Sequence, residues 1–122
     1  MKRVLVVDDE QQAIDVFKAA LTSVGYEVEV SDSGKHALEL VKASQFDVMI
    51  VDEMMPDMSG NSIIKVLRQD PATAKLPIIV LTNFNDDQLV KEAIAAGAND
   101  YILKYQMTPD DLSMKIKDLI GE

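Results

Sequence analysis

The chain has 122 residues, of which 48% are hydrophobic, and carries a net charge of −9 at pH 7. This length fits one domain over 1–122 with a sizeable core, and the hydrophobic content argues against disorder. The acidic balance disfavours direct binding of nucleic acid, whose phosphates reward clustered Lys and Arg. The lack of cysteine excludes disulfides and thiolate metal sites, and no apolar run approaches the roughly 18 residues of a membrane span. We therefore expect a cytoplasmic protein without membrane contact.

Short apolar runs alternate with amphipathic stretches along the chain. The expected strands are 4–7, 26–30, 47–51, 78–82 and 100–104. Four of them lack in/out alternation, which is typical of a parallel sheet covered by helices on both faces, whereas 26–30 alternates and is expected at an edge. The first expected helix carries an apolar stripe made of Ala13, Val16, Phe17, Ala20, Leu21 and Val24. Four later stripes lie around 37–41, 63–67, 89–94 and 112–120.

Glycine, proline and acidic residues mark the ends of the expected helices. Gly25 and Gly97 lie where a left-handed residue would end the first and fourth helices. Thr108 and Pro109 are typical of a helix start, and 85–87 is a similar but weaker start. Repeated strand–helix units with right-handed crossovers predict an α/β fold, a five-stranded parallel sheet flanked by five helices.

Polar side chains stand at the carboxyl ends of four of these strands. Asp8 and Asp9 follow the first strand, and Asp52 follows the third. Thr82 closes the fourth strand and Lys104 closes the fifth. Ligands of open parallel sheets bind at this edge, and three crowded carboxylates repel one another unless a cation lies among them. The residues therefore predict a magnesium site that handles a phosphoryl group.

Each of these residue types has a role in such chemistry. We expect Asp9 and Asp52 to bind the ion directly, Asp8 to act through a water, and a backbone carbonyl just after Asp52 to add an oxygen. Asp52 could attack phosphorus as a carboxylate nucleophile. Lys104 would supply fixed positive charge, and Thr82 a hydroxyl that reorients once phosphate arrives.

Taken singly, the same residues have simpler interpretations. The acidic run 8–10 could be no more than a helix cap, and 52–53 could be a solvated loop. Thr82 could be a cap or turn residue, and Lys104 a solvated strand end. The convergence of four strand ends is what favours a site.

The methionines after Asp52 and the single histidine have less specific interpretations. Met54, Met55 and Met58 could form a flexible patch for partners, although packing over the site and on the sheet is favoured. His36, the single histidine, is expected at the surface of the second helix.

The order and spacing of the motifs resemble one family over essentially the whole chain. The segments that carry the resemblance are Asp8-Asp9-Glu10, Asp52-Glu53-Met54-Met55-Pro56-Asp57-Met58-Ser59-Gly60, Pro77-Ile78-Ile79-Val80-Leu81-Thr82 and Lys104. They are similar to the receiver domain of two-component response regulators, in a single-domain form like the chemotaxis regulators. The resemblance implies the flavodoxin-like, doubly wound strand order 2-1-3-4-5.

The resemblance also implies roles for residues at the strand ends. Asp52 would accept a phosphoryl group from the phosphohistidine of a histidine kinase or phosphotransfer protein. Mg²⁺ would be held by Asp8, Asp9, Asp52 and the backbone carbonyl of Met54. These assignments imply a signalling phosphoacceptor that assists its own phosphorylation and dephosphorylation, not an enzyme for external substrates.

The resemblance further implies which residues switch upon phosphorylation and which surface passes the signal on. Thr82 would be the switch hydroxyl, Lys104 the phosphate-binding lysine and Tyr101 the switch aromatic. The surface 86–120 would then control a downstream effector protein, or an output domain outside this chain. A monomer or a weak homodimer is expected.

Three positions depart from the family pattern. Tyr105 replaces the proline that normally follows the lysine in a cis peptide; since a non-proline cis bond costs about 3 kcal/mol, we expect Lys104–Tyr105 to be trans. Asn83 stands where a small residue is usual, and Glu53 where apolar residues are frequent.

The residues around the acidic run and Asp52 also bear on other functions of this fold class. An aspartyl phosphohydrolase would need a second acid two residues after Asp52, but Met54 occupies that position. A flavin-binding protein would need a hydroxyl- and glycine-rich phosphate loop where the chain has an acidic run. The open alternative is an interaction module of the same fold that is never phosphorylated.

Overall fold

The computed structural model describes residues 1–121. The strands are β1 (Arg3–Val7), β2 (Glu27–Ser31), β3 (Val48–Val51), β4 (Ile78–Thr82) and β5 (Asp100–Leu103). The helices are α1 (Gln11–Ser23), α2 (Gly34–Ala43), α3 (Gly60–Gln69), α4 (Asp87–Ala96) and α5 (Pro109–Ile120), with a short 3₁₀ helix, η1 (Lys104–Gln106), after β5. Every strand pairing is parallel and the order is β2-β1-β3-β4-β5. The predicted fold class and strand order are therefore confirmed.

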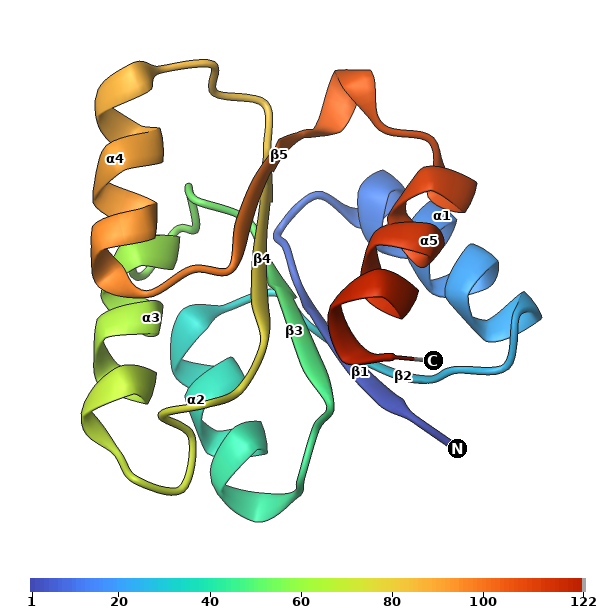
Figure 1. Cartoon of the computed structure of the whole chain (residues 1–122), viewed down its shortest axis with the longest axis horizontal. Coiled ribbons are helices and arrows are strands. Elements are labelled where there is room, and N and C mark those ends of the chain that lie inside the picture. The colour runs from blue at the N-terminus through green and yellow to red at the C-terminus, as the bar shows by residue number, and fades with distance from the viewer. Residues whose placement is uncertain (122) are drawn as a thin grey trace.

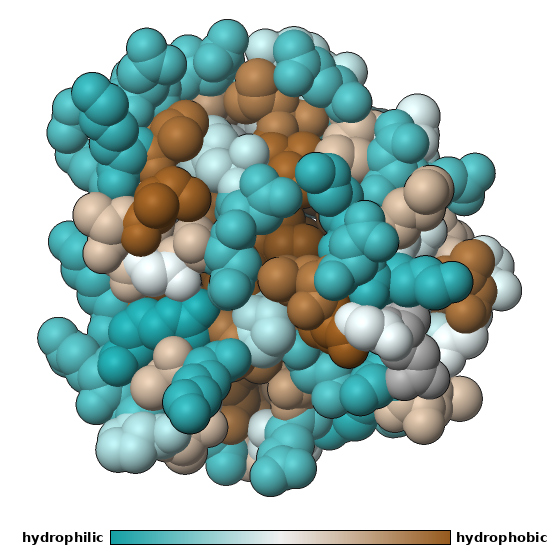
Figure 2. Space-filling view, viewed as in Figure 1, coloured by the Kyte–Doolittle hydropathy of each residue, from teal (hydrophilic) through white to brown (hydrophobic). Residues whose placement is uncertain are grey.

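The sheet is the middle of three layers. Helices α1 and α5 cover one face, and α2, α3 and α4 cover the other (Figure 1). Successive residues of β1 alternate between the two cores, with Val4 and Val6 packed toward α1 and α5, and Leu5 and Val7 toward the opposite helices. Figure 2 shows hydrophobic side chains gathered between the helical layers, with hydrophilic residues over the outside.

The helix boundaries follow the predicted signals. Gly25 and Gly97 adopt positive φ angles of 102° and 115°, the left-handed conformation that favours glycine after a helix. Thr108 caps α5 by accepting the N–H of Asp111, whose side chain in turn accepts the N–H of Thr108. Asp86 caps α4. No helix among residues 1–121 combines the length and apolarity needed to cross a membrane.

Parts of the predicted apolar stripes are wrong. In α1 the buried residues are Ile14, Phe17 and Leu21, spaced three and four apart on the side that faces the sheet. Val16 lies two residues beyond Ile14, which turns it toward solvent, and Val24 lies just after the last residue of the helix. The stripe residues found exposed are Val16, Val24, Val66 and Ile94.

Candidate functional site

The register of the sheet brings three predicted site residues together. Val7 lies opposite Val51, so Asp8 and Asp52 leave neighbouring strands side by side. The N–H of Asp52 donates to the carbonyl of Val7 at 2.9 Å, which extends the ladder to the start of the loop. Lys104 follows β5, and its Nζ lies 2.7 Å from Asp8 Oδ2 and 3.3 Å from Asp52 Oδ2. The lysine thus joins both carboxylates across the edge of the sheet.

Three carboxylates gather around this contact. Oxygens of Asp8, Asp9 and Asp52 lie within 4.8 Å of one another. Asp8 and Asp52 are buried, with only 4% and 8% of their surface exposed, whereas Asp9 is exposed. Carboxylate oxygens are preferred ligands of Mg²⁺, so this cluster could hold such an ion.

The pKa values of Asp8 and Lys104 are both raised in the fold. Burial raises the pKa of Asp8, an effect that its contacts with Lys104 reduce and the charge of Asp52 reinforces. Burial lowers the pKa of Lys104, but the hydrogen bond to Asp8 and the charge of Asp52 outweigh it, and the net pKa lies above its ordinary value. Because Asp8 and Lys104 both bind their protons more tightly beside the charge of Asp52, a further cation would be stabilised here.

The capping interpretation of the acidic run has little support. Asp8 Oδ1 accepts the backbone N–H of Glu10 at 3.0 Å. Glu10, at the N-cap of α1, makes no side-chain capping hydrogen bond. Its carboxylate instead lies 3.3 Å from Lys104 Nζ. Glu10 was not predicted as a site residue, although its place directly after the acidic pair was a signal.

Thr82 and Tyr101 meet at a residue that the sequence did not single out. Thr82 is fully buried at the end of β4, and its Oγ1 accepts the N–H of Phe84 at a long 3.4 Å. The hydroxyl of half-buried Tyr101 donates to the carbonyl of the same Phe84 at 2.8 Å. Burial, together with the charge of Glu53, raises the pKa of Tyr101 to about 12. Thr82 closes β4, the strand next to β3, and among residues 1–121 no hydrogen bond joins it to Asp52.

Glu53 is buried although it directly follows Asp52. Only 3% of its surface is exposed. Its carboxylate accepts the backbone N–H of Asn61, while its Oε2 has no hydrogen-bond partner. Burial, followed by the repulsion of nearby acids, raises its pKa to about 7. The sequence marked Glu53 as unusual, but gave no sign that it lies inside the fold.

The other departures from the family pattern lie on one side of the cluster. The expected trans peptide between Lys104 and Tyr105 is confirmed, since residues 1–121 contain no cis peptide bond. Asn83, Lys104 and Tyr105 line a cavity of about 320 Å³ that also touches α1. Tyr105 is 63% exposed at this cavity.

The remaining residues of interest are largely structural. Met55 and Met58 pack on the core beneath α2 and α3, as favoured, while Met54 is 52% exposed. His36 is exposed on α2, as expected, with Nδ1 2.9 Å from Ser31 Oγ.

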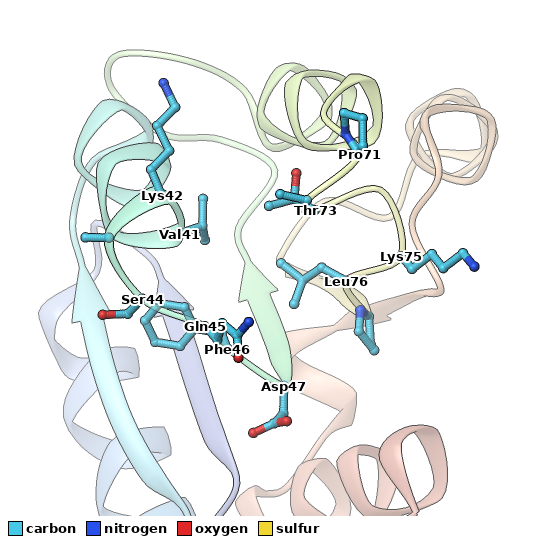
Figure 3. Close-up of a pocket in the computed structure, with 13 residues that line it drawn as sticks. Val41, Lys42, Ser44, Gln45, Phe46, Asp47, Pro71, Thr73, Lys75 and Leu76 are labelled. Atoms are coloured by element: carbon cyan, nitrogen blue, oxygen red, sulfur yellow. The ribbon is translucent and has the colours of Figure 1, made fainter.

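A larger cavity lies away from the cluster. It measures about 760 Å³ and lies between the end of α2 and the segment that joins α3 to β4 (Figure 3). Phe46 and Leu76 are among its lining residues, and none of the predicted site residues reaches it.

Comparison with known proteins agrees with this geometry. The family model described as the response regulator receiver domain matches residues 4–117. The response regulator SaeR of Staphylococcus aureus is 32% identical over 120 residues, which cover 98% of this chain and 51% of SaeR. The chain thus spans about half the length of the curated relatives it matches.

Solved structures show the same likeness. The chemotaxis response regulator CheY4 of Vibrio cholerae is 31% identical, with a TM-score of 0.90 and 98% of each chain covered. A CheY-like receiver domain protein from Methanospirillum hungatei is 29% identical, with a TM-score of 0.92, and covers 99% of this chain and 94% of its own. The chain therefore belongs to the family of response regulator receiver domains.

Proposed function

We propose that Asp52 is a phosphoacceptor that takes a phosphoryl group from the phosphohistidine of a histidine kinase or phosphotransfer protein. The observation that carries the proposal is the contact of Lys104 with both Asp8 and Asp52 inside a cluster of three carboxylates. A carboxylate oxygen of Asp52 would form the new P–O bond as the N–P bond breaks. The imidazole leaves with the electron pair of that bond and takes up a proton.

The chain's own groups would prepare this transfer. Lys104 is held in place by the carboxylates of Asp8, Glu10 and Asp52, and it is poised to pair with the incoming phosphoryl oxygens. Mg²⁺ would be held by Asp8, Asp9, Asp52 and the Met54 carbonyl, whose oxygen atoms are the kind of ligand that this ion prefers. When bound, the ion would offset the charge of the carboxylates and of the transferred group.

Phosphorylation would be read out through Thr82 and Tyr101. The Thr82 hydroxyl has only the long hydrogen bond from Phe84 to give up when it turns toward a phosphoryl group. Since Phe84 also accepts the Tyr101 hydroxyl, a shift of its backbone would release the tyrosine. The surface over 86–120, which begins beside this segment, would then change its affinity for an effector or an output domain.

Intact-protein mass spectrometry after incubation with a small-molecule phosphodonor tests the proposal. We expect one added phosphoryl group that requires Mg²⁺, is lost in Asp52→Asn and is kept in Asp118→Asn, a matched change at an exposed position of α5. An adduct that survives in Asp52→Asn would refute the assignment of the acceptor. If the wild type forms no adduct and binds no Mg²⁺, the result would favour the interaction module that is never phosphorylated.

A further inference from the structure

The loop between β3 and α3 is attached to the start of α2 by the carboxylate of Asp57. Asp57 Oδ1 accepts the N–H of Gly34 at 2.8 Å, and Oδ2 accepts the N–H of Lys35 at 2.9 Å. Both donors belong to the first turn of α2, where backbone N–H groups have no partner inside the helix. Ser33, the N-cap of α2, serves the N–H of His36 instead. The first turn of α2 is therefore satisfied partly by its own cap and partly by a loop 23 residues away.

An apolar contact lies beside these two hydrogen bonds to Asp57. Met58 packs against the core under α2 and α3, and a Cβ added at Gly34 would overlap Met58 Cγ. The two N–H groups also hold the pKa of Asp57 below its usual range, so the carboxylate stays charged and accepts strong hydrogen bonds. Gly34 thus receives both a polar and an apolar contact from the same loop.

Apart from Asp57 and the packing of Met55 and Met58, the loop is held at its base. The N–H of Gly60 donates to the carbonyl of Glu53 at 2.7 Å, which closes the loop where it leaves β3 and enters α3. Within residues 1–121, Asp57 is the only residue of 54–59 that hydrogen-bonds to an element other than β3 and α3. Without it, the segment that carries Met54 would keep its base and lose the polar anchor of its tip.

We propose that Asp57 is a positioning residue, which clamps the β3–α3 loop to α2 and so fixes the Met54 carbonyl for Mg²⁺. The inference rests on the proposed function, in which that carbonyl and the carboxylates of the cluster would hold the ion. Because Mg²⁺ demands near-octahedral geometry, a carbonyl oxygen whose position is not fixed is a poor ligand. Coupling between two sites is reciprocal, so Mg²⁺ should in turn steady the contact between Asp57 and α2.

Isothermal titration of metal-free protein with MgCl₂ tests the clamp. Asp57→Ala should raise the Kd for Mg²⁺ about tenfold, the low end of the effect of removing a residue that orients a ligand. Asp57→Asn keeps one acceptor oxygen in place and should fall between the alanine variant and the wild type. Asp32→Ala removes the same charge at an exposed position two residues before Gly34 and should bind like the wild type.

Amide hydrogen exchange provides a readout that does not depend on phosphorylation. In the wild type, Mg²⁺ should slow exchange at Gly34 and Lys35, and in Asp57→Ala this effect should vanish. If Asp57→Ala binds Mg²⁺ as tightly as the wild type, or if Asp57→Ala and Asp32→Ala lose the same Mg²⁺ affinity, the role of Asp57 is refuted. Neither result would bear on the proposed metal site itself. A wild type that binds no Mg²⁺ would overturn the proposed metal site and the inference with it.

Discussion

Replacing Glu53 with Gln should stabilise the metal-free protein at about pH 8 and change its stability little at about pH 5. Glu53 is 3% exposed, and its Oε2 has no hydrogen-bond partner. Its pKa rises from an ordinary value of 4.5 to about 7 in the fold, chiefly because burial disfavours the charged form. The nearby Oδ1 of Asn61 also has no partner, so a protonated Glu53 would supply a donor where donors are lacking.

The sign and size of the effect follow from proton linkage. Between about pH 4.5 and 7 the folded protein keeps a proton on Glu53 that the unfolded chain has released, so the free energy of unfolding falls as pH rises through this interval. At 1.36 kcal/mol per pKa unit, the penalty is about 3 kcal/mol at pH 8 and below about 1 kcal/mol at pH 5. Gln has nearly the same shape and carries no charge, so the variant should escape this penalty.

Urea unfolding in the presence of EDTA, repeated at several pH values from 5 to 8, measures the difference. The stability of Glu53→Gln relative to the wild type should grow from pH 5 to about pH 7 and then level off. Glu39→Gln, the same change at an exposed position of α2, should show no such trend. Parallel pH profiles of the wild type and Glu53→Gln would show that the carboxyl is already charged at pH 5, and the reasoning from burial would be wrong.

Two further substitutions test the packing around the site. Lys104→Met should destabilise metal-free protein by about 3 kcal/mol, because it leaves buried Asp8 and Asp52 without their cation; urea unfolding should show no comparable loss for Lys115→Met, whose lysine is exposed. Gly60→Ala should lower the thermal midpoint and reduce the free energy of unfolding by about 2 kcal/mol, because its Cβ would lie 2.7 Å from the carbonyl oxygen of Asp52. An unchanged midpoint would mean that the loop can move aside.

Several features of this protein could be predicted from local patterns. The strands were found from short apolar runs, because a strand covered on both faces has no need of polar positions. The helix ends at Gly25, Gly97 and Thr108 follow from backbone geometry within a few residues. The acid cluster followed from topology alone, because parallel strands bring their carboxyl ends to the same edge of a sheet. The trans peptide before Tyr105 was predictable from its covalent chemistry.

Other features depend on contacts between distant segments. Val16 belonged to an apolar pattern, but the orientation of α1 on the sheet left it exposed and buried Ile14 in its place. Nothing around Asp57 announces that its carboxylate would reach the start of α2, since the two donors lie more than 20 residues earlier in the chain. Phe84 became the meeting point of Thr82 and Tyr101 through its backbone, which every residue possesses.

Glu53 illustrates the division most clearly. The sequence places an acid beside Asp52, and by itself an acid favours water. In the fold it is almost fully buried, and its pKa approaches neutrality as a result. Which groups come together at the strand ends was thus determined by the order of apolar runs and polar endings along the chain. Their burial, proton affinity and anchoring were decided only by the tertiary structure, because desolvation and hydrogen bonding depend on residues that are remote in sequence.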